Sequence, residues 1–407
     1  MKGLLDVANN RRDFLRTGAS LAALSAVGLG ANGAAMGTAS AEAATNGAHS
    51  PRPIRAVKWP VLEGAGTPKL CQWFSRTPTE ETVRRWRQAG VDHALVTNPP
   101  PLPWTAADLR ADVKRLDKMG MGLLGVLFSA PESAVLGLAG RDEKINEVKQ
   151  SIRAAGRAGI PVVEYNWYVH RLSEGYHEVI GRGGAGYTAF DYELDVDGVP
   201  VKDLPRPEGV KEYTREQLWD NLEYFLRAVV PVAEQAGVRL AVHPNDPPAP
   251  ISRGNPQILA TFDDWKRLVD SVPSPSNGMT VDPGVTAEIG EDPLEVVRYM
   301  GKRDCINHVH FRNVVVEKPS VKYAEVFPDN GQVDMFAFMR ELIRHDYRYG
   351  ILAEHPRALD YDREHDEIGG QYADVGGGGH AGELYDTGYC RGLMQAALIT
   401  EGKVPSR

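Results

Sequence analysis

The chain has few cysteines, and none of them shows a metal-binding or redox spacing. Only three occur among 407 residues, at Cys71, Cys305 and Cys390, so the sequence predicts neither a C-x-x-C motif nor a disulfide framework. Runs of lysine and arginine are also absent, and the formal net charge is −8. An acidic chain without basic runs argues against nucleic acid and against an anionic membrane surface as partners.

The signatures of two common enzyme classes are missing as well. No serine lies in a G-x-S-x-G motif, which disfavours a hydrolase with a nucleophilic serine. A glycine-rich run at residues 181–186 lies in a predicted loop, with neither a strand directly before it nor a helix directly after it. This context disfavours a dinucleotide-binding site.

Long hydrophobic runs are absent too. The weakly apolar stretch at residues 21–36 is too short and too rich in glycine for a transmembrane helix. It follows Arg11-Arg12 within the run Asn10–Arg16, and small residues at 39–43 offer cleavage sites, an order typical of twin-arginine export signals. We therefore predict a signal peptide at residues 1–44, a linker at 45–68, and an exported mature protein, periplasmic or extracellular, without a membrane anchor.

From residue 69 onward, apolar runs of strand length alternate with helical patterns. Strands are predicted at 69–74, 93–98, 122–129, 161–167, 238–243, 278–282, 306–314 and 350–354. Helices are predicted at 80–89, 106–118, 144–158, 215–236, 261–270, 293–301, 333–345 and 387–400. This alternation predicts an α/β fold, a single-domain (β/α)8 TIM barrel at residues 69–401.

Two stretches interrupt the regular spacing. Residues 168–213 and 360–386 show little periodicity, and we expect them to be long loops after strands four and eight. Both would leave the carboxyl-terminal face of the barrel, which is where barrel active sites lie.

Four predicted strands end on imidazole or carboxylate side chains. These are His243, Asp282, His310 and Glu354. Because the carboxyl ends of neighbouring strands meet at the mouth of a barrel, we expect the four side chains to bind one divalent metal ion. Two imidazoles and two carboxylates suit Mn²⁺, Fe²⁺, Co²⁺ or Zn²⁺.

Two further residues leave the composition of this site open. His308 and His310 share one face of their strand, so either ring can point inward. Glu164 ends the fourth predicted strand and is a candidate additional ligand or a base.

Other polar side chains crowd the same predicted mouth. Arg312 and Arg357 have the planar geometry that binds a carboxylate, and Asn166 and Asn313 can bind hydroxyl groups. His355 follows a candidate ligand and can transfer protons near neutral pH.

Several short runs carry a resemblance to a known family. They are Tyr165-Asn166-Trp167, His243-Pro244-Asn245-Asp246-Pro247-Pro248, Asn277–Thr280, His310-Phe311-Arg312-Asn313-Val314 and Gly331–Met335. In this order, between residues 69 and 398, the chain resembles the mannonate dehydratases, which belong to the xylose-isomerase-like group of barrels.

The resemblance implies an activity and roles for particular residues. The family removes water from D-mannonate, gives 2-dehydro-3-deoxy-D-gluconate, and uses a divalent metal, commonly Mn²⁺. Its His, Cys, His and Asp ligands fall at His243, Asp282, His310 and Glu354. Its catalytic His and Tyr fall at His355 and Tyr385. Family members are often oligomeric, so a homo-oligomer is expected.

Two other functions fit the same residues. A sugar isomerase or epimerase of the xylose-isomerase-like group would use the same metal, with Glu164 and Glu354 as acid and base. An exported carbohydrate-binding protein without catalytic activity would bind the sugar but not convert it.

Overall fold

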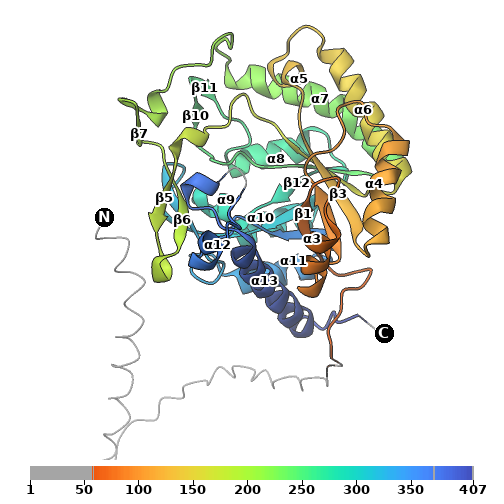
Figure 1. Cartoon of the computed structure of the whole chain (residues 1–407). Coiled ribbons are helices and arrows are strands. Elements are labelled where there is room, and N and C mark those ends of the chain that lie inside the picture. Colours follow the sequence, from red (N-terminus) through yellow and green to blue (C-terminus); the bar gives the residue numbers. More distant parts are fainter. Residues whose placement is uncertain (1–56, 58, 370–371, 406–407) are drawn as a thin grey trace, which may run out of the picture. The chain divides into compact units, whose positions relative to one another are not determined.

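The computed structural model describes residue 57, residues 59–369 and residues 372–405, which include a closed barrel of eight parallel strands (Figure 1). The predicted signal peptide and residues 45–56 of the predicted linker lie outside the described residues.

The eight strands confirm the predicted barrel. Hydrogen-bonded neighbours within the barrel follow the order β1-β16-β13-β12-β9-β4-β3-β2. The strands are β1 (Lys69–Phe74), β2 (His93–Val96), β3 (Gly122–Ser129), β4 (Val162–Asn166), β9 (Arg239–Val242), β12 (Asn277–Val281), β13 (Ile306–Phe311) and β16 (Gly350–Ala353). Strands β9, β12, β13 and β16 are buried at every position, as expected for parallel strands that helices cover.

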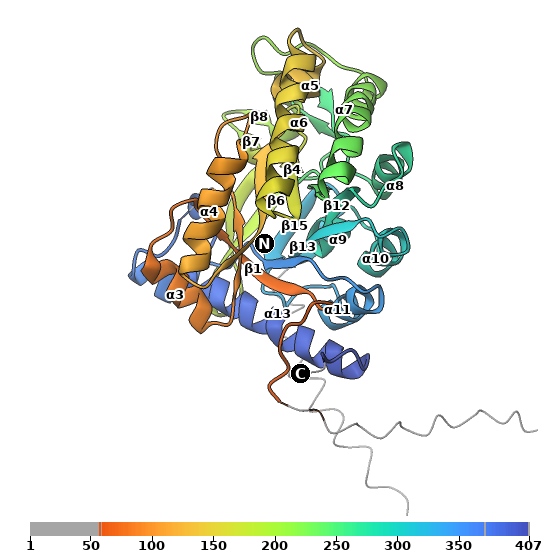
Figure 2. The same ribbon diagram turned by 90° about the vertical axis from the view of Figure 1, so that its right-hand side faces the viewer.

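Helices surround the barrel in the predicted alternation (Figure 2). They are α3 (Glu80–Gln88), α4 (Ala106–Lys118), α5 (Glu132–Leu136), α6 (Arg141–Ala158), α7 (Arg215–Ala236), α8 (Phe262–Ser271), α9 (Pro283–Glu288), α10 (Pro293–Gly301), α11 (Met335–Arg344), α12 (Asp360–Glu364) and α13 (His380–Thr400). Threonine caps begin several of them: Thr214 accepts from the Gln217 amide, and Gln217 accepts in return from the Thr214 amide. Within the described part of the chain, no helix combines the length and apolarity that a membrane span requires.

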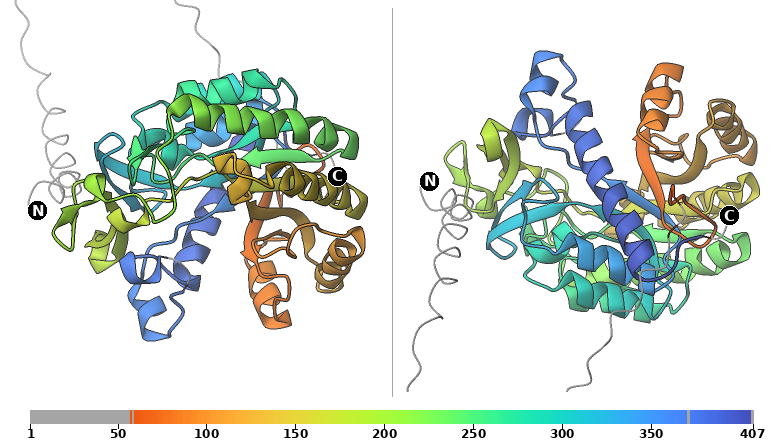
Figure 3. Two further views of the ribbon diagram at one scale, coloured as in Figure 1. Left: turned by 90° about the horizontal axis from the view of Figure 1, so that it is seen from above. Right: turned by 90° about the horizontal axis from the view of Figure 1, so that it is seen from below.

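The stretch after strand four contains more regular structure than its sequence indicates. Strands β5 (Tyr176–Ile180) and β6 (Gly186–Asp191) pair with a hairpin of β14 (Asn313–Lys318) and β15 (Lys322–Val326), in the order β14-β15-β6-β5. Figure 3 shows these segments together beside the barrel. Two further pairs of short strands, β7 (Asp195–Val196) with β8 (Val199–Pro200) and β10 (Ile251–Ser252) with β11 (Asn255–Pro256), extend the connections.

The predicted strand at 306–314 is therefore wrong at its end. The barrel strand stops at Phe311, and Asn313 begins β14 in the second sheet. Arg312 lies at the break, which turns its side chain into the carboxyl-terminal end of the barrel. The last predicted helix also begins earlier, at His380, so Tyr385 lies on α13 and not in a loop.

The glycine run at 376–379 packs against backbone. A Cβ on Gly378 would lie 2.1 Å from the Arg357 carbonyl oxygen, and one on Gly376 would lie 2.5 Å from the Tyr187 carbonyl oxygen. Gly376 also has a φ of +90°, which side chains disfavour. These glycines allow the loop to lie directly on the backbone of Arg357, which follows β16, and on that of Tyr187 in β6.

Candidate metal centre and active site

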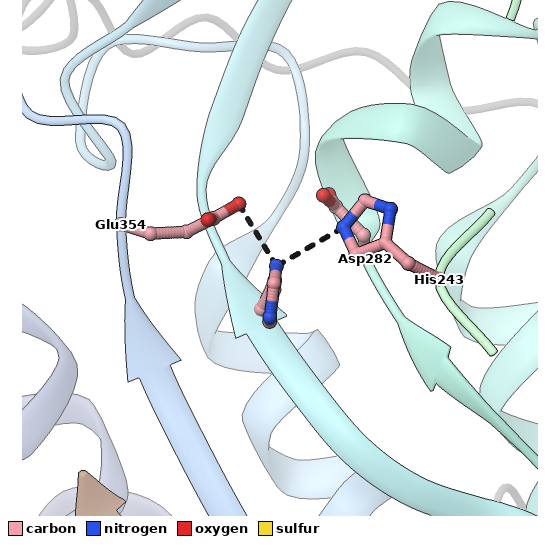
Figure 4. A group of neighbouring side chains, drawn as sticks. His243, Asp282 and Glu354 are labelled. Carbon is pink, nitrogen blue, oxygen red and sulfur yellow. Dashed lines mark hydrogen bonds and ion pairs between the residues drawn. The ribbon is translucent and has the colours of Figure 1, made fainter. Parts of the chain in front are cut away.

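The ends of four barrel strands bring the four predicted metal ligands together. His243 follows β9, Asp282 follows β12, His310 lies near the end of β13, and Glu354 follows β16. One nitrogen or oxygen atom from each lies within 4.8 Å of the others. Figure 4 shows His243, Asp282 and Glu354 converging from separate strand ends.

The backbone fixes which nitrogen of His243 faces the group. Its Nδ1 lies 2.7 Å from the Pro244 carbonyl oxygen, which can only accept a hydrogen bond, so Nδ1 carries the proton. Nε2 is then unprotonated and lies 3.1 Å from His310 Nδ1. Burial and the nearby His310 lower the pKa of His243 to about 4, which keeps its ring neutral as metal binding requires.

His310 makes contacts from both sides of its ring. Nδ1 lies 3.1 Å from Glu354 Oε1, on the side of the predicted ligands. Nε2 lies 3.1 Å from Glu164 Oε1, on the opposite side. Glu164 thus supports His310 from behind and is not a member of the four-residue group.

His308 lies with Glu164 in that supporting layer. Its Nδ1 is 3.1 Å from Glu164 Oε2, and its Nε2 is 3.6 Å from Cys71 Sγ. Thr280 completes the layer by donating its hydroxyl to Glu164 Oε1 at 2.8 Å. Of the two histidines that the sequence left open, the structure brings His310 to the predicted ligands.

The spacing of donor atoms fits a cation. Adjacent ligand atoms in an octahedral shell with bonds of 2.0–2.2 Å lie about 3 Å apart. The contacts of His310 Nδ1 with His243 Nε2 and with Glu354 Oε1, both 3.1 Å, have this length. Among the residues that the structure describes, Glu354 Oε1 is also buried without a hydrogen-bond partner. The donor set is consistent with a divalent metal.

Arg312 lies beside this group within a ring of carboxylates. Its Nε lies 2.8 Å from Asp282 Oδ2, and its Nη1 lies 2.6 Å from Glu288 Oε1. Carboxylates of Asp246, Glu325 and Glu354 lie at 3.5–3.6 Å. This guanidinium, predicted to bind a substrate carboxylate, is buried and already surrounded by carboxylates of the protein.

These buried charges shift the pKa values in opposite directions. Burial raises the pKa of Asp282, although Arg312 acts against it. Burial would also raise the pKa of Glu354, but His310 and His355 hold it well below its usual range. The structure therefore keeps Glu354 ionised.

His355 is held on two sides. Its Nδ1 lies 2.9 Å from Glu325 Oε2, its Nε2 lies 3.6 Å from Glu354 Oε2, and its ring centroid lies 4.6 Å from that of Tyr372. The backbone of His355 has a φ of 48°, which is uncommon for a residue with a side chain and frequent at active sites.

The other predicted site residues lie in different surroundings. Arg357 is buried and donates to Glu325 and to the His355 carbonyl oxygen. Asn313 is buried as well, and its amide hydrogen-bonds to backbone atoms of Val314, Pro328 and Val333. Asn166, half-buried, ends β4.

Tyr385 lies apart from His355 in the contacts that the structure shows. Its hydroxyl accepts from Arg182 Nη2 at 3.3 Å, its ring packs on Phe327, and it is 39% exposed. The tyrosine in contact with the His355 ring is Tyr372. Sequence reasoning missed Tyr372 because it assigned the tyrosine by family resemblance within a loop of little periodicity.

Glu325 was also missed. It lies on β15, in a stretch between residues 314 and 333 for which no element was predicted. A signal was present, since the β-rich runs Val314–Val316 and Tyr323–Val326 flank Pro319-Ser320, a turn pattern that predicts a hairpin.

Comparison with known proteins gives one consistent family. The sequence model described as D-mannonate dehydratase (UxuA) matches residues 69–401. A mannonate dehydratase of Streptococcus pneumoniae (strain 70585) is 30% identical over 340 residues, which are 78% of this chain and 89% of that protein. One from Thermotoga petrophila is 30% identical over 324 residues, which are 71% of this chain and 89% of that protein.

Solved structures agree with this match. The mannonate dehydratase from Streptococcus suis serotype 2 superposes with a TM-score of 0.70 at 27% identity, covering 84% of this chain and 96% of that one. A xylose isomerase domain protein from Alicyclobacillus acidocaldarius has a TM-score of 0.51 at 14% identity, covering 81% and 99%, and shares the fold.

Proposed function

Because the chain belongs to the D-mannonate dehydratase family and is an enzyme of the lyase class, we propose that it removes water from D-mannonate to give 2-dehydro-3-deoxy-D-gluconate. The observation that carries this proposal is the convergence of His243, Asp282, His310 and Glu354 at one barrel mouth, with His355 beside them. The substrate class is a small sugar acid.

The residues that would hold the cofactor are these four strand-end side chains, and Mn²⁺ is the proposed metal. When bound, a divalent cation supplies Lewis-acid stabilisation of the negative charge that develops next to the substrate carboxylate. The orientation of the two imidazoles supports this role, because His243 presents an unprotonated Nε2 toward His310 Nδ1.

The proton transfers fall to His355 and Tyr372. The carboxylates of Glu325 and Glu354 raise the pKa of His355 against the effect of burial, which makes this ring a stronger proton acceptor. Burial raises the pKa of Tyr372 well above its usual value, which keeps the phenol protonated and able to donate. In this proposal His355 takes the C2 proton, the C2–C3 double bond forms, and Tyr372 protonates the C3 hydroxyl, which leaves as water. The resulting enol loses its C2 hydroxyl proton and gains a proton at C3, which gives the 2-keto-3-deoxy product.

The test is a product assay on purified protein reconstituted with Mn²⁺. We expect formation of a 2-keto-3-deoxy acid from D-mannonate and its loss on chelation. Other aldonic acids in the same assay measure selectivity. A metal-loaded protein that forms no such product from D-mannonate would refute the proposal.

The isomerase alternative depended on Glu164 as half of an acid–base pair. Glu164 contacts His310 and His308 and has no exposed surface. This position supports a structural role for Glu164, and the family membership favours the dehydratase over both alternatives.

Export of the protein and its assembly into a homo-oligomer remain proposals. The twin-arginine pattern supports export through residues 1–44. Lysine substitution of Arg11 and Arg12 should retain the protein in the cytoplasm, as cell fractionation would show. Light scattering of the purified protein would test the oligomer.

A further inference from the structure

The second sheet contributes a glutamate to the immediate surroundings of His355. Glu325 lies on β15, is 1% exposed, and reaches His355 from outside the barrel strands. Its Oε2 accepts from His355 Nδ1 at 2.9 Å and from Arg357 Nη2 at 2.9 Å. One carboxylate oxygen therefore joins the histidine ring to a buried arginine.

Arg357 holds both partners of this contact. Besides the side chain of Glu325, it donates from Nη1 to the Glu325 carbonyl oxygen at 2.8 Å and from Nε to the His355 carbonyl oxygen at 3.0 Å. The same guanidinium thus fixes the backbone of His355, with its positive φ, and the carboxylate that orients the ring.

This geometry determines where the ring proton lies. An ionised carboxylate only accepts hydrogen bonds, so the neutral His355 ring must carry its proton on Nδ1. Nε2 is then the free base, on the side of Glu354 Oε2 at 3.6 Å, where the predicted metal ligands gather. A carboxylate that orients a histidine base is a recurring arrangement in enzymes.

We propose that Glu325 is a positioning residue for His355, held in place by Arg357, and that it keeps the ring proton on Nδ1 so that Nε2 can accept the substrate proton. This inference rests on the proposed function. It also gives Arg357 a role that differs from substrate binding, since its donors are directed to Glu325 and His355.

Glu325→Gln tests the proposal. A glutamine has one acceptor oxygen, and Arg357 competes for it, so the amide NH2 turns toward His355 Nδ1 and favours the tautomer with the proton on Nε2. Because general base catalysis contributes about 10²–10⁴-fold, we expect kcat to fall by about 10²-fold or more while KM changes less than about threefold. Metal content should remain that of the wild type, whereas some loss of melting temperature is expected because Arg357 loses its buried charged partner.

The control is Glu341→Gln on α11. Glu341 is also a buried glutamate between two arginines, 3.0 Å from Arg298 Nη2 and 3.1 Å from Arg344 Nη1, but it lies outside the site. The Glu341→Gln substitution should leave kcat unchanged. With mannonate deuterated at C2, the isotope effect on kcat should rise in Glu325→Gln alone, because proton abstraction becomes slower.

The outcomes separate the two proposals. An inactive wild type refutes the proposed function. If the wild type is active and Glu325→Gln has the same kcat as the control, the positioning role is wrong. It is also wrong if loss of bound metal explains the whole decrease in kcat. Should the variant not fold, ¹⁵N spectra of histidine-labelled wild type loaded with Mg²⁺ decide the question. The His355 resonances, identified by their loss in His355→Gln, should show a protonated Nδ1, and a neutral ring with its proton on Nε2 would overturn the proposal.

Discussion

The two ends of the barrel each bury an arginine, and the two arginines have different surroundings. At the amino-terminal end, Arg239 donates to Asn307 Oδ1 at 2.7 Å and to Asp304 Oδ2 at 3.0 Å, and it lies over the Tyr349 ring. Asn307 in turn donates to backbone carbonyls of neighbouring segments. These polar groups connect the start of β9 with β13 and with the residues that precede β12 and β13.

At the carboxyl-terminal end, Arg312 has five carboxylates within 3.6 Å. Arg357 also pairs with Glu325, and Arg171 lies 3.6 Å from Asp246. The adjacent group of predicted ligands has donor atoms that lie within 4.8 Å of one another. At the amino-terminal end, the donors of Arg239 meet acceptors at hydrogen-bond distance, which favours stability. The other end keeps a costly arrangement of charge that a cation and a substrate can complete.

The largest expected effect is a loss of activity on substitution of a predicted metal ligand at the carboxyl-terminal end. His243→Ala removes a neutral ligand and leaves no buried charge unpaired, so the fold should persist. Because a metal supplies several kcal/mol of transition-state stabilisation, kcat/KM should fall by about 10³-fold or more. Metal analysis should show loss of the bound ion, and a variant that keeps full metal content would contradict the assignment of this centre.

Metal binding to the predicted ligands at the carboxyl-terminal end should also stabilise the fold. At a free Mn²⁺ concentration of about 100 times Kd, the free energy of unfolding should rise by about 2.7 kcal/mol relative to chelated protein. Urea denaturation with and without Mn²⁺ measures this difference. It should disappear in His243→Ala, and an equal Mn²⁺ effect in that variant would place the ion elsewhere.

At the amino-terminal end we expect a loss of stability without a loss of activity. Arg239→Met leaves the Asn307 oxygen without its donor, and we expect a loss of about 2 kcal/mol in the free energy of unfolding. The kcat of the folded variant at 25 °C should stay within about twofold of wild type, measured beside urea denaturation. A large loss of kcat with intact stability would contradict a purely structural role for Arg239.

An effect on stability that is limited to part of the pH range is expected at Glu63, which precedes β1. Its Oε1 accepts from the Leu70 amide, and burial raises its pKa to about 7. A carboxyl pKa that is higher in the folded than in the unfolded state stabilises the fold at low pH, and this contribution is lost as pH rises from about 4.5 to about 7.

Glu63→Gln should therefore weaken the decrease in the free energy of unfolding between pH 5 and pH 8, by about 2.5 kcal/mol. Urea denaturation of both proteins across this range measures the change. Parallel pH profiles of variant and wild type would show that Glu63 does not titrate as described.

At the carboxyl-terminal end, the sequence predicted the positions of those site residues that directly follow a short buried strand. His243, Asp282 and Glu354 each come directly after such a run, so barrel geometry alone brings them together. The choice between His308 and His310 was not predictable, since alternation places both on one face. In the structure His310 contacts the predicted ligands His243 and Glu354, and Glu164 lies between the rings of His310 and His308.

The residues around His355 were harder to predict because they come from the connections between barrel elements. Glu325 depends on the pairing of β15 with β6, a contact between segments more than 130 positions apart in the sequence. Tyr372 lies in a loop whose composition carries no periodic signal. Long-range pairing of short strands leaves little trace in local sequence, whereas a buried parallel strand is apparent from its own residues.

The glycine run at 376–379 has a consequence for protein engineering. Its composition resembles that of a flexible linker, which is where designers usually place tags, insertions or permuted termini. Yet a single added methyl group at Gly378 would meet the Arg357 carbonyl oxygen. A substitution library across this loop should be depleted of active variants as strongly as one across a barrel strand, and insertion sites in this enzyme are better sought elsewhere.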